Sequence, residues 1–176
     1  RAEVQRRGLQ VDFLVNNAGF GSSGAFLDQD LTSEVGMVEV NVAALLRLCH
    51  LFGREMRARG HGRILNIASL AAIAHAPLMA AYAASKAGVT SLGQSLRAQY
   101  AKGPIAVTVL EPGYIESEMT ARAGATMLMV DNETGVRALV GAIESERGQA
   151  AVPGWPWTPM VALMKLTPTR FAKIFA

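Results

Sequence analysis

The chain is organised around the stretch Ser69–Lys86, which reads SLAAIAHAPLMAAYAASK. A serine ends an apolar run, Tyr82 follows 13 positions later, and Lys86 stands four residues beyond the tyrosine. A helix that starts near Ala80 would place Tyr82 and Lys86 on one face, because residues four apart are neighbours on a helix surface. An ammonium beside a phenol favours the phenolate and lowers the phenol's pKa. The pattern predicts a general acid and base for a carbonyl or alcohol, with Ser69 able to hold the same oxygen. A functionless surface tyrosine above a lysine stem is the alternative.

Two further segments stand where predicted strands end. The apolar run Val11–Val15 is typical of a buried parallel strand and leads into Asn16–Gly19, which reads NNAG. A second apolar run, Ile105–Leu110, is followed by Pro112 and Gly113, where a proline without an N–H and a glycine free to take positive φ predict a sharp exit from the strand. Ligands of open α/β sheets bind at the carboxyl ends of the strands, so both segments are placed to contact a nucleotide. The alternative for NNAG is an ordinary turn.

A glycine pattern next to the first strand has a different interpretation. Gly19, Gly21 and Gly24 formally match the dinucleotide fingerprint G-x-G-x-x-G. That fingerprint works by placing pyrophosphate at a helix N-terminus, but the residues that follow are loop-like and the next helix is predicted near Thr32. We therefore interpret the pattern as a flexible loop beside the substrate cleft.

The segment from Thr32 to about Arg57 has a strong helical pattern, and we expect Gly62 to end the helix. Cys49 is interpreted as a small core side chain, with a redox role as the alternative. Asn41 lies beside the packing face, where a half-exposed polar residue would be ordinary. The packing face consists of apolar residues three and four positions apart: Val35, Val38, Val42, Leu45, Cys49, Phe52 and Met56.

The remaining elements continue an alternation of strands and helices. Arg63–Ala68 is predicted as a buried strand that delivers Ser69 at its carboxyl end. Thr134–Glu146 is predicted as an amphipathic helix, and Ala150–Val152 as a short last strand. This alternation predicts an α/β fold with a parallel sheet.

Taken together, these signals resemble the short-chain dehydrogenase/reductase family. The resemblance runs from about Val11 to Ser117 and depends on the order and spacing of NNAG, Asn41, Ser69 with Tyr82 and Lys86, and Pro112–Gly113. It implies an NAD(P)-dependent oxidoreductase that interconverts a carbonyl and a secondary alcohol by hydride transfer, with a hydrophobic substrate. The alternative is a non-catalytic scaffold or pseudoenzyme subunit, which would not need the four catalytic residues.

The resemblance also implies roles for individual residues. Tyr82 would give or take the proton, Lys86 would lower its pKa and hold the nicotinamide ribose, and Ser69 would orient the substrate. The backbone carbonyl of Asn41 would hold a water of a proton relay. The implied cofactor is NAD or NADP, and its contacts would be Asn17, Ala18, Gly19, Tyr82, Lys86, Pro112, Gly113, Ile115 and Ser117. Threonine is commoner than serine at the last of these positions, which is a conservative departure.

Two parts of the family pattern are missing from the 176 residues: the glycine-rich turn that seats the pyrophosphate and the second strand, whose end selects NAD or NADP. We therefore expect a doubly wound parallel sheet of the Rossmann type that is incomplete, a C-terminal half beginning at the fourth strand of the family. Val11–Val15 would then be an open apolar edge. The chain begins without methionine inside a charged, helix-like segment, which we interpret as a truncated reading frame. The fragment alone is expected to be inactive.

Residues 1–154 are expected to form the partial domain, and residues 155–176 an amphipathic tail. Trp155 and Trp157 precede an apolar segment that carries Lys165 and is divided by Pro168. Such a tail could lie in a membrane interface, pack on a neighbouring subunit or close a hydrophobic substrate pocket.

Composition restricts the class of protein. The net charge is +3, from 17 basic and 14 acidic residues, and basic stripes with interleaved aromatics are missing, so nucleic-acid binding is not indicated. The single cysteine excludes an intrachain disulfide and fits a reducing cytoplasm. No membrane span and no metal site are predicted. The resemblance to the short-chain dehydrogenase/reductase family further implies a small-molecule substrate and further copies of the chain as partners, in a homodimer or homotetramer.

Overall fold

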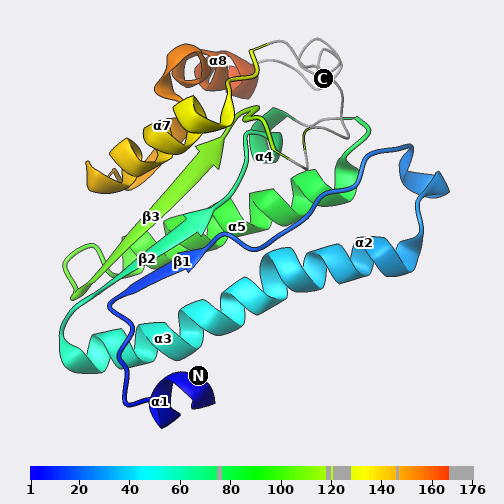
Figure 1. Cartoon of the computed structure of the whole chain (residues 1–176). Coiled ribbons are helices and arrows are strands. Elements are labelled where there is room, and N and C mark those ends of the chain that lie inside the picture. Colours follow the sequence, from blue (N-terminus) through cyan, green and yellow to red (C-terminus); the bar gives the residue numbers. More distant parts are fainter. Residues whose placement is uncertain (75–76, 118–119, 121–127, 146, 167–176) are drawn as a thin grey trace.

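The computed structural model describes residues 1–74, 77–117, 120, 128–145 and 147–166. Four parallel strands form one sheet in the order β1-β2-β3-β4 (Figure 1), and they are β1 Phe13–Asn16, β2 Gly62–Ile67, β3 Ile105–Pro112 and β4 Gln149–Val152. The described helices are α1 Ala2–Arg6, η1 Phe26–Asp28, α2 Leu31–Val38, η2 Glu39–Ala44, α3 Leu45–Arg59, α4 Ala71–Ala74, α5 Ala80–Gln99, α7 Asn132–Glu144 and α8 Gly154–Leu166. This arrangement confirms the predicted α/β parallel sheet.

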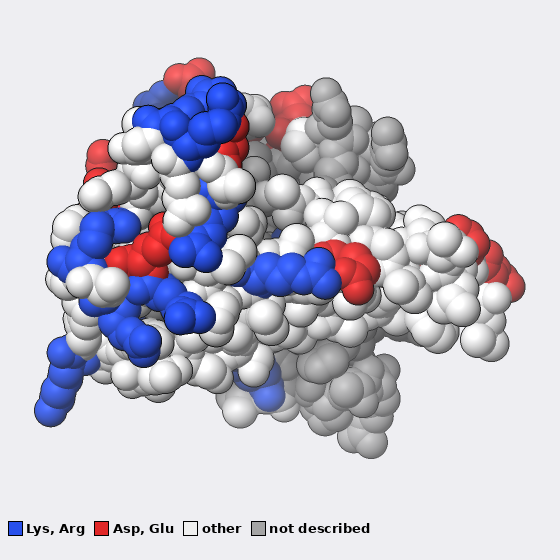
Figure 2. Space-filling view, turned by 90° about the horizontal axis from the view of Figure 1, so that it is seen from below, with Lys and Arg blue, Asp and Glu red and all other residues white. Residues whose placement is uncertain are grey.

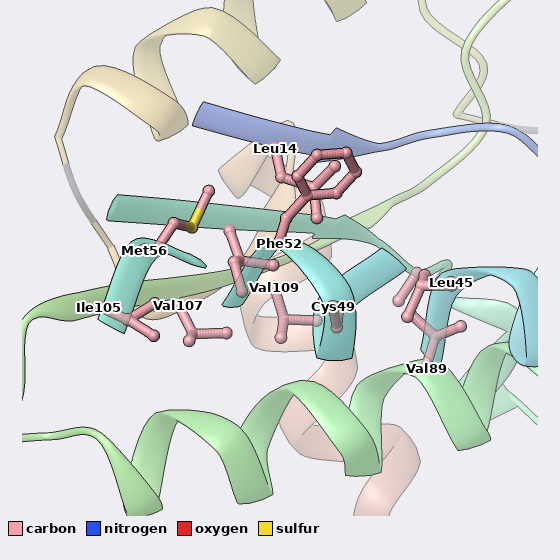
Figure 3. Close-up of a cluster of buried hydrophobic side chains, with 11 residues drawn as sticks. Leu14, Leu45, Cys49, Phe52, Met56, Val89, Ile105, Val107 and Val109 are labelled. Carbon is pink, nitrogen blue, oxygen red and sulfur yellow. The ribbon is translucent and has the colours of Figure 1, made fainter. Parts of the chain in front are cut away.

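Helices cover the sheet on both sides, as a doubly wound fold requires. The helices α3 and α5 pack on one side, where their side chains and those of the strands form the larger core (Figure 3): Leu14, Leu45, Cys49, Phe52, Met56, Ile64, Ala68, Val89, Ile105, Val107 and Val109. Helix α7 packs on the other side, against Leu65, Leu110 and Val152. Consecutive residues are buried in β2 and toward the end of β3, which explains why these strands read as continuous apolar runs, since both faces of the sheet are covered.

Strand β1 lies at the edge of the sheet, as predicted. Leu14 faces the core of α3 and α5, but Phe13 and Val15, on the opposite face, are 41% and 50% exposed. An apolar edge strand with one bare face is a site where further strands can pair.

The long helix differs from its sequence pattern in its first half. Val35 and Val38 are exposed, whereas Met37 and Asn41 are buried. The reason is the π-helical stretch η2 between α2 and α3, because its wider turns shift the buried face and give it a spacing of four residues through this region. The predicted packing face is therefore wrong before Leu45 and right from Leu45 to Met56.

The ends of this helix follow from local chemistry. Asp30 caps its start, accepting hydrogen bonds from the backbone N–H groups of Thr32 and Ser33 at 3.4 and 2.9 Å. Gly60, with φ of +83°, ends it in the left-handed conformation. The prediction that Gly62 ends the helix is wrong: Gly62 begins β2, and a Cβ there would meet the Met56 side chain.

Leu31–Arg59 is also long and apolar enough, by length and composition alone, to cross a membrane, although we predicted no span. Its buried side chains in α3 belong to the larger core, so the structure accounts for their apolar character by packing. The tail begins in α8, which packs against β4 and α4, while residues 167–176 lie outside the described residues. Membrane contact through the tail remains a prediction.

Candidate active site

A cavity of about 760 Å³ opens at the carboxyl ends of the strands, where ligands of such sheets bind. The chain segments that follow β1, β2 and β3 each contribute to it, together with α5 and α8. Ser69 follows β2, and Tyr82 and Lys86 lie on α5, so the structure brings these three predicted residues to one cavity. Lys86 is the only charged residue among the described residues that line the cavity.

Tyr82 and Lys86 lie one turn apart on α5 and are both buried, at 8% and 6% exposure. The ammonium nitrogen of Lys86 is 5.8 Å from the centroid of the Tyr82 ring. It donates a hydrogen bond to the backbone carbonyl of Ile67, at 3.0 Å. The last residue of β2 thus holds the lysine beside the tyrosine.

Burial determines the proton affinities of this pair. Burial raises the pKa of Tyr82, and a hydrogen bond with Ser69 acts in the lowering direction. Burial also lowers the pKa of Lys86 to about 8, since the charged form loses its hydration. The expectation that Lys86 lowers the pKa of Tyr82 is therefore not met in this structure, because burial outweighs the other effects on the phenol and the ammonium is bonded to Ile67.

Asn41 is buried at the centre of a hydrogen-bond network. Its amide accepts from the backbone N–H of Phe20 at 3.1 Å and donates to the Phe20 carbonyl at 2.9 Å. The same amide donates to the Ser85 hydroxyl at 3.0 Å, which in turn donates to the backbone carbonyl of Tyr82 at 2.8 Å. Asn41 therefore joins the loop after β1 to the helix of the tyrosine, and it does so from the π-helical stretch. The relay role of its backbone carbonyl remains a prediction.

No local sequence pattern indicated the role of Ser85. Only its position three residues after Tyr82, with the hydroxyl able to reach back to the tyrosine's own carbonyl, could have suggested it.

The glycines of the loop after β1 are needed for close packing against these residues. A Cβ at Gly19 would lie 2.6 Å from the Asn41 Oδ1 and 3.6 Å from the Lys86 Nζ. A Cβ at Gly21 would lie 3.0 Å from the Tyr82 ring. No α-helix begins at this loop: the next one starts at Leu31, which agrees with our rejection of the dinucleotide fingerprint.

The other predicted cofactor contacts near β1 divide into two groups. Asn17 and Gly19 line the cavity. Ala18 is exposed and is not among the lining residues.

The end of β3 and the turn after it supply four predicted residues to the cavity wall: Pro112, Gly113, Ile115 and Ser117. Ile115 pairs with Val130 in an isolated parallel bridge. The backbone N–H of Ser117 donates to the Thr120 hydroxyl at 2.8 Å, and that hydroxyl donates to the Ile115 carbonyl at 3.0 Å. These bonds fix the turn internally.

Gly113 is glycine for a reason that differs from our prediction. It is not among the described glycines with positive φ, which are Gly8, Gly24 and Gly60. Instead, a Cβ on Gly113 would lie 2.4 Å from the indole of Trp157. Close packing, and not backbone conformation, excludes a side chain here.

Several wall residues were not predicted as site residues. Tyr114 follows Gly113, and its ring centroid lies 6.0 Å from that of Trp157. Trp157 and Met164 come from α8, and a group of apolar residues comes from the segment after Ser69: Leu70, Ala71, Ala74, Pro77, Leu78 and Met79. Nothing in the local sequence of α8 separates a wall residue from a surface one, since Trp155 is exposed and Trp157 is buried.

Comparison with known proteins agrees with this geometry. The family model described as short chain dehydrogenase matches residues 2–128. An uncharacterized oxidoreductase of Mycobacterium tuberculosis is 51% identical over 167 residues, which cover 94% of this chain and 66% of the relative. The chain thus spans slightly less than two thirds of that relative's length.

Solved structures give the same result. A bulky-bulky ketone specific alcohol dehydrogenase from Comamonas testosteroni is 28% identical, with a TM-score of 0.77 over 94% of this chain and 65% of that one. A short-chain dehydrogenase from Sphingobium yanoikuyae, in complex with NADPH, is 26% identical, with a TM-score of 0.79 over 92% of this chain and 66% of that one. With its tyrosine, lysine and serine at one cavity, the chain belongs to the short-chain dehydrogenase family.

Proposed function

We propose that this chain forms the catalytic part of an NAD(P)-dependent oxidoreductase that interconverts a hydrophobic ketone and its secondary alcohol. The observation that carries the proposal is the meeting of Ser69, Tyr82 and Lys86 at one largely apolar cavity. A phenol and a hydroxyl at one point can hold a carbonyl oxygen and exchange a proton with it. The buried ammonium beside them supplies positive charge where that oxygen becomes negative.

The described residues suit the nicotinamide half of such a cofactor. Because Gly19 has no side chain, the space beside the Lys86 Nζ is open. A Cβ on Gly19 would lie 3.6 Å from that nitrogen. Lys86 would hold the nicotinamide ribose, and Pro112, Gly113 and Ile115 would line the face of the ring. The bound cofactor would supply or accept the hydride. The family's glycine-rich pyrophosphate turn is not in the 176 residues, so we propose that they do not catalyse alone.

The chain's own residues would then perform the proton chemistry. Ser69 would orient the substrate oxygen, and Tyr82 would donate its proton as the alcohol forms. Tyr82 is protonated at neutral pH and so has a proton to give, and the burial that raises its pKa also makes it a weaker acid. Asn41 would keep the loop after β1 and α5 in register through its bonds to Phe20 and Ser85.

The cavity lining supports an uncharged, apolar substrate. Its described residues include Leu70, Leu78, Met79, Trp157 and Met164, and Lys86 is their only charged member. A substrate carboxylate would lose its hydration among these side chains, and the one charged lining residue, Lys86, is assigned to the nicotinamide ribose. The solved alcohol dehydrogenase specific for bulky ketones is in keeping with this substrate class.

The test is a substrate comparison with the chain extended by its own upstream coding sequence. Purified enzyme would be given NADH or NADPH with benzophenone, acetone, or the charged aromatic keto acid phenylglyoxylate. We expect saturable oxidation of one cofactor with kcat/KM highest for benzophenone and lowest for the keto acid. A preference for the keto acid, or no turnover of any carbonyl, would contradict the proposal.

We also propose that the chain forms a homo-oligomer through its long helices. Large apolar residues on α2 and α3 are exposed: Leu31 at 72%, Val35 at 54% and Leu46 at 49%. Seen from the side of these helices, much of the surface is uncharged, but a basic and an acidic side chain lie together near its middle (Figure 2), and these helices carry the exposed ion pair between Arg47 and Glu39. Light scattering should give a mass of at least two chains, and Leu46→Glu should lower it. A wild-type mass of one chain would contradict this.

A further inference from the structure

The two tryptophans of α8 lie two positions apart and have opposite environments. Trp155 is 80% exposed, whereas Trp157 is 3% exposed and lines the cavity. The buried indole occupies the space that a Cβ on Gly113 would need, with Cε2 and Nε1 both 2.4 Å from that position. The Trp157 indole therefore packs into the space left by the missing side chain of Gly113, which we call the hole at Gly113.

This contact joins two parts of the cavity that come from distant parts of the chain. Gly113 belongs to the turn after β3, where the nicotinamide is expected, and Trp157 belongs to a helix that packs on β4 and α4. Tyr114 packs against the same indole, with an angle of 58° between the ring planes. Met164, which is seven residues after Trp157 on α8, also lines the cavity. A shift of the indole would move the cavity wall and press on the turn together.

The indole N–H has no hydrogen-bond partner among the described residues and is buried. Its atom is not exposed to the cavity, so the surface that Trp157 presents there is the apolar part of the ring. The tryptophan is therefore suited to define the shape of the wall, and not to bind a polar group of the ligand.

We propose that Trp157, seated in the hole at Gly113, is the residue that sets the size of substrate the cavity accepts, and that it positions the turn after β3. The inference rests on the proposed ketone–alcohol function and deepens it. The substrate class is a bulky apolar ketone or secondary alcohol, one of whose substituents packs against this indole.

The proposal is tested by making Trp157 smaller and Gly113 larger, singly and together, in the enzyme extended by its upstream coding sequence. Trp157→Leu should raise kcat/KM for benzophenone relative to acetone by about 10-fold or more, because a pocket discriminates by the volume it offers. Gly113→Ala should lower kcat/KM for benzophenone and weaken cofactor affinity, since the new methyl displaces the indole. The double variant Gly113→Ala/Trp157→Leu should recover most of both losses, because the smaller side chain leaves room for the methyl.

The matched control is Trp155→Leu, which makes the same change two positions away on the exposed side. It should leave the benzophenone-to-acetone ratio unchanged. If Trp157→Leu does not fold, Trp157→Phe retains an aromatic ring and should give an intermediate ratio. An unchanged ratio in a folded Trp157 variant, or a double variant no better than Gly113→Ala alone, would overturn the proposal.

A binding measurement separates this proposal from the proposed function. In the 176-residue chain with Trp155→Phe, Trp157 is the sole tryptophan. Benzophenone should quench its fluorescence saturably, whereas free N-acetyltryptophanamide should show only linear, collisional quenching. If quenching in the 176-residue chain is saturable but the extended enzyme reduces no ketone, the proposed function is overturned and the wall assignment stands. Linear quenching of Trp157 would overturn the wall assignment, whatever the activity.

Discussion

Replacing Lys86 by methionine should change how the stability of the chain depends on pH. Burial lowers the pKa of this lysine from 10.5 to about 8. Below pH 8 the ammonium is charged in both the folded and the unfolded chain, so the folded state carries the full cost of burying it. Between pH 8 and 10.5 the unfolded chain binds more protons than the folded one, and stability rises with pH in this window.

The size of the effect follows from the shift. At about 1.4 kcal/mol for each pH unit between the two values, the buried charge costs roughly 3 kcal/mol at pH 7. Methionine removes that cost but also removes the bond to the Ile67 carbonyl, and a hydrogen bond of a charged group is worth about 1.5 to 3 kcal/mol. The variant should therefore be about as stable as wild type, or slightly more stable, at pH 7. It should lose roughly 3 kcal/mol relative to wild type by pH 10.5.

Urea unfolding followed by circular dichroism at pH 7, 8, 9 and 10 would measure both free energies. Burial raises the pKa of Cys49 to about 11, and it raises the pKa of Tyr82, so both groups lower stability at high pH. They are present in both proteins, and the difference between the two free energies isolates Lys86. Lys102→Met, which makes the same substitution at an exposed lysine, is the matched control. A difference for Lys86→Met that changes by less than about 1 kcal/mol across the range would refute the reasoning.

Three other predictions concern the same site. Tyr82→Phe in the extended enzyme should lower kcat by at least ~100-fold and leave cofactor affinity nearly unchanged, and a variant that keeps more than about a tenth of kcat would rule out the acid–base role. Asn41→Ala should lower the free energy of unfolding by about 2 to 4 kcal/mol, because the backbone of Phe20 loses both its bonds to the buried amide, whereas exposed Asn17→Ala should stay within about 0.5 kcal/mol. An equal effect of the two asparagine variants in urea unfolding would contradict the network. The 176 residues alone should show no saturable NAD(P)-dependent turnover in a spectrophotometric assay, and such turnover would mean that the cofactor is held without the family's glycine-rich turn.

The features that the sequence predicted correctly depend on local spacing. Tyr82 and Lys86 share a face because they are four residues apart on a helix, and Ser69 reaches the cavity because it follows a buried strand. The edge position of β1 followed from the strands missing from the family pattern. The parallel sheet needed only the alternation of apolar runs and amphipathic helices.

The features that it missed depend on contacts between distant segments. The π-helical stretch η2 shifts the buried face so that Val35 is exposed and Asn41 is buried, and Asn41 bonds to a loop 21 residues earlier in the chain. Gly113 is fixed by Trp157, which is 44 positions away and has no local sequence pattern that separates it from Trp155. The direction of the Tyr82 pKa shift depends on burial, which the spacing of Tyr82 and Lys86 does not reveal.

Transfer of deuterium from the cofactor to the substrate carbon tests the central claim most directly. The extended enzyme would be given benzophenone with NADH or NADPH that carries deuterium at one C4 position, and the alcohol product would be examined by mass spectrometry. With the label in the transferred position, wild type should place one deuterium on the carbinol carbon, the opposite C4 label should yield none, and Tyr82→Phe should give almost no alcohol. Unlabelled alcohol from both cofactor labels, or equal labelled product from Tyr82→Phe, would contradict hydride transfer at the site formed by Ser69, Tyr82 and Lys86.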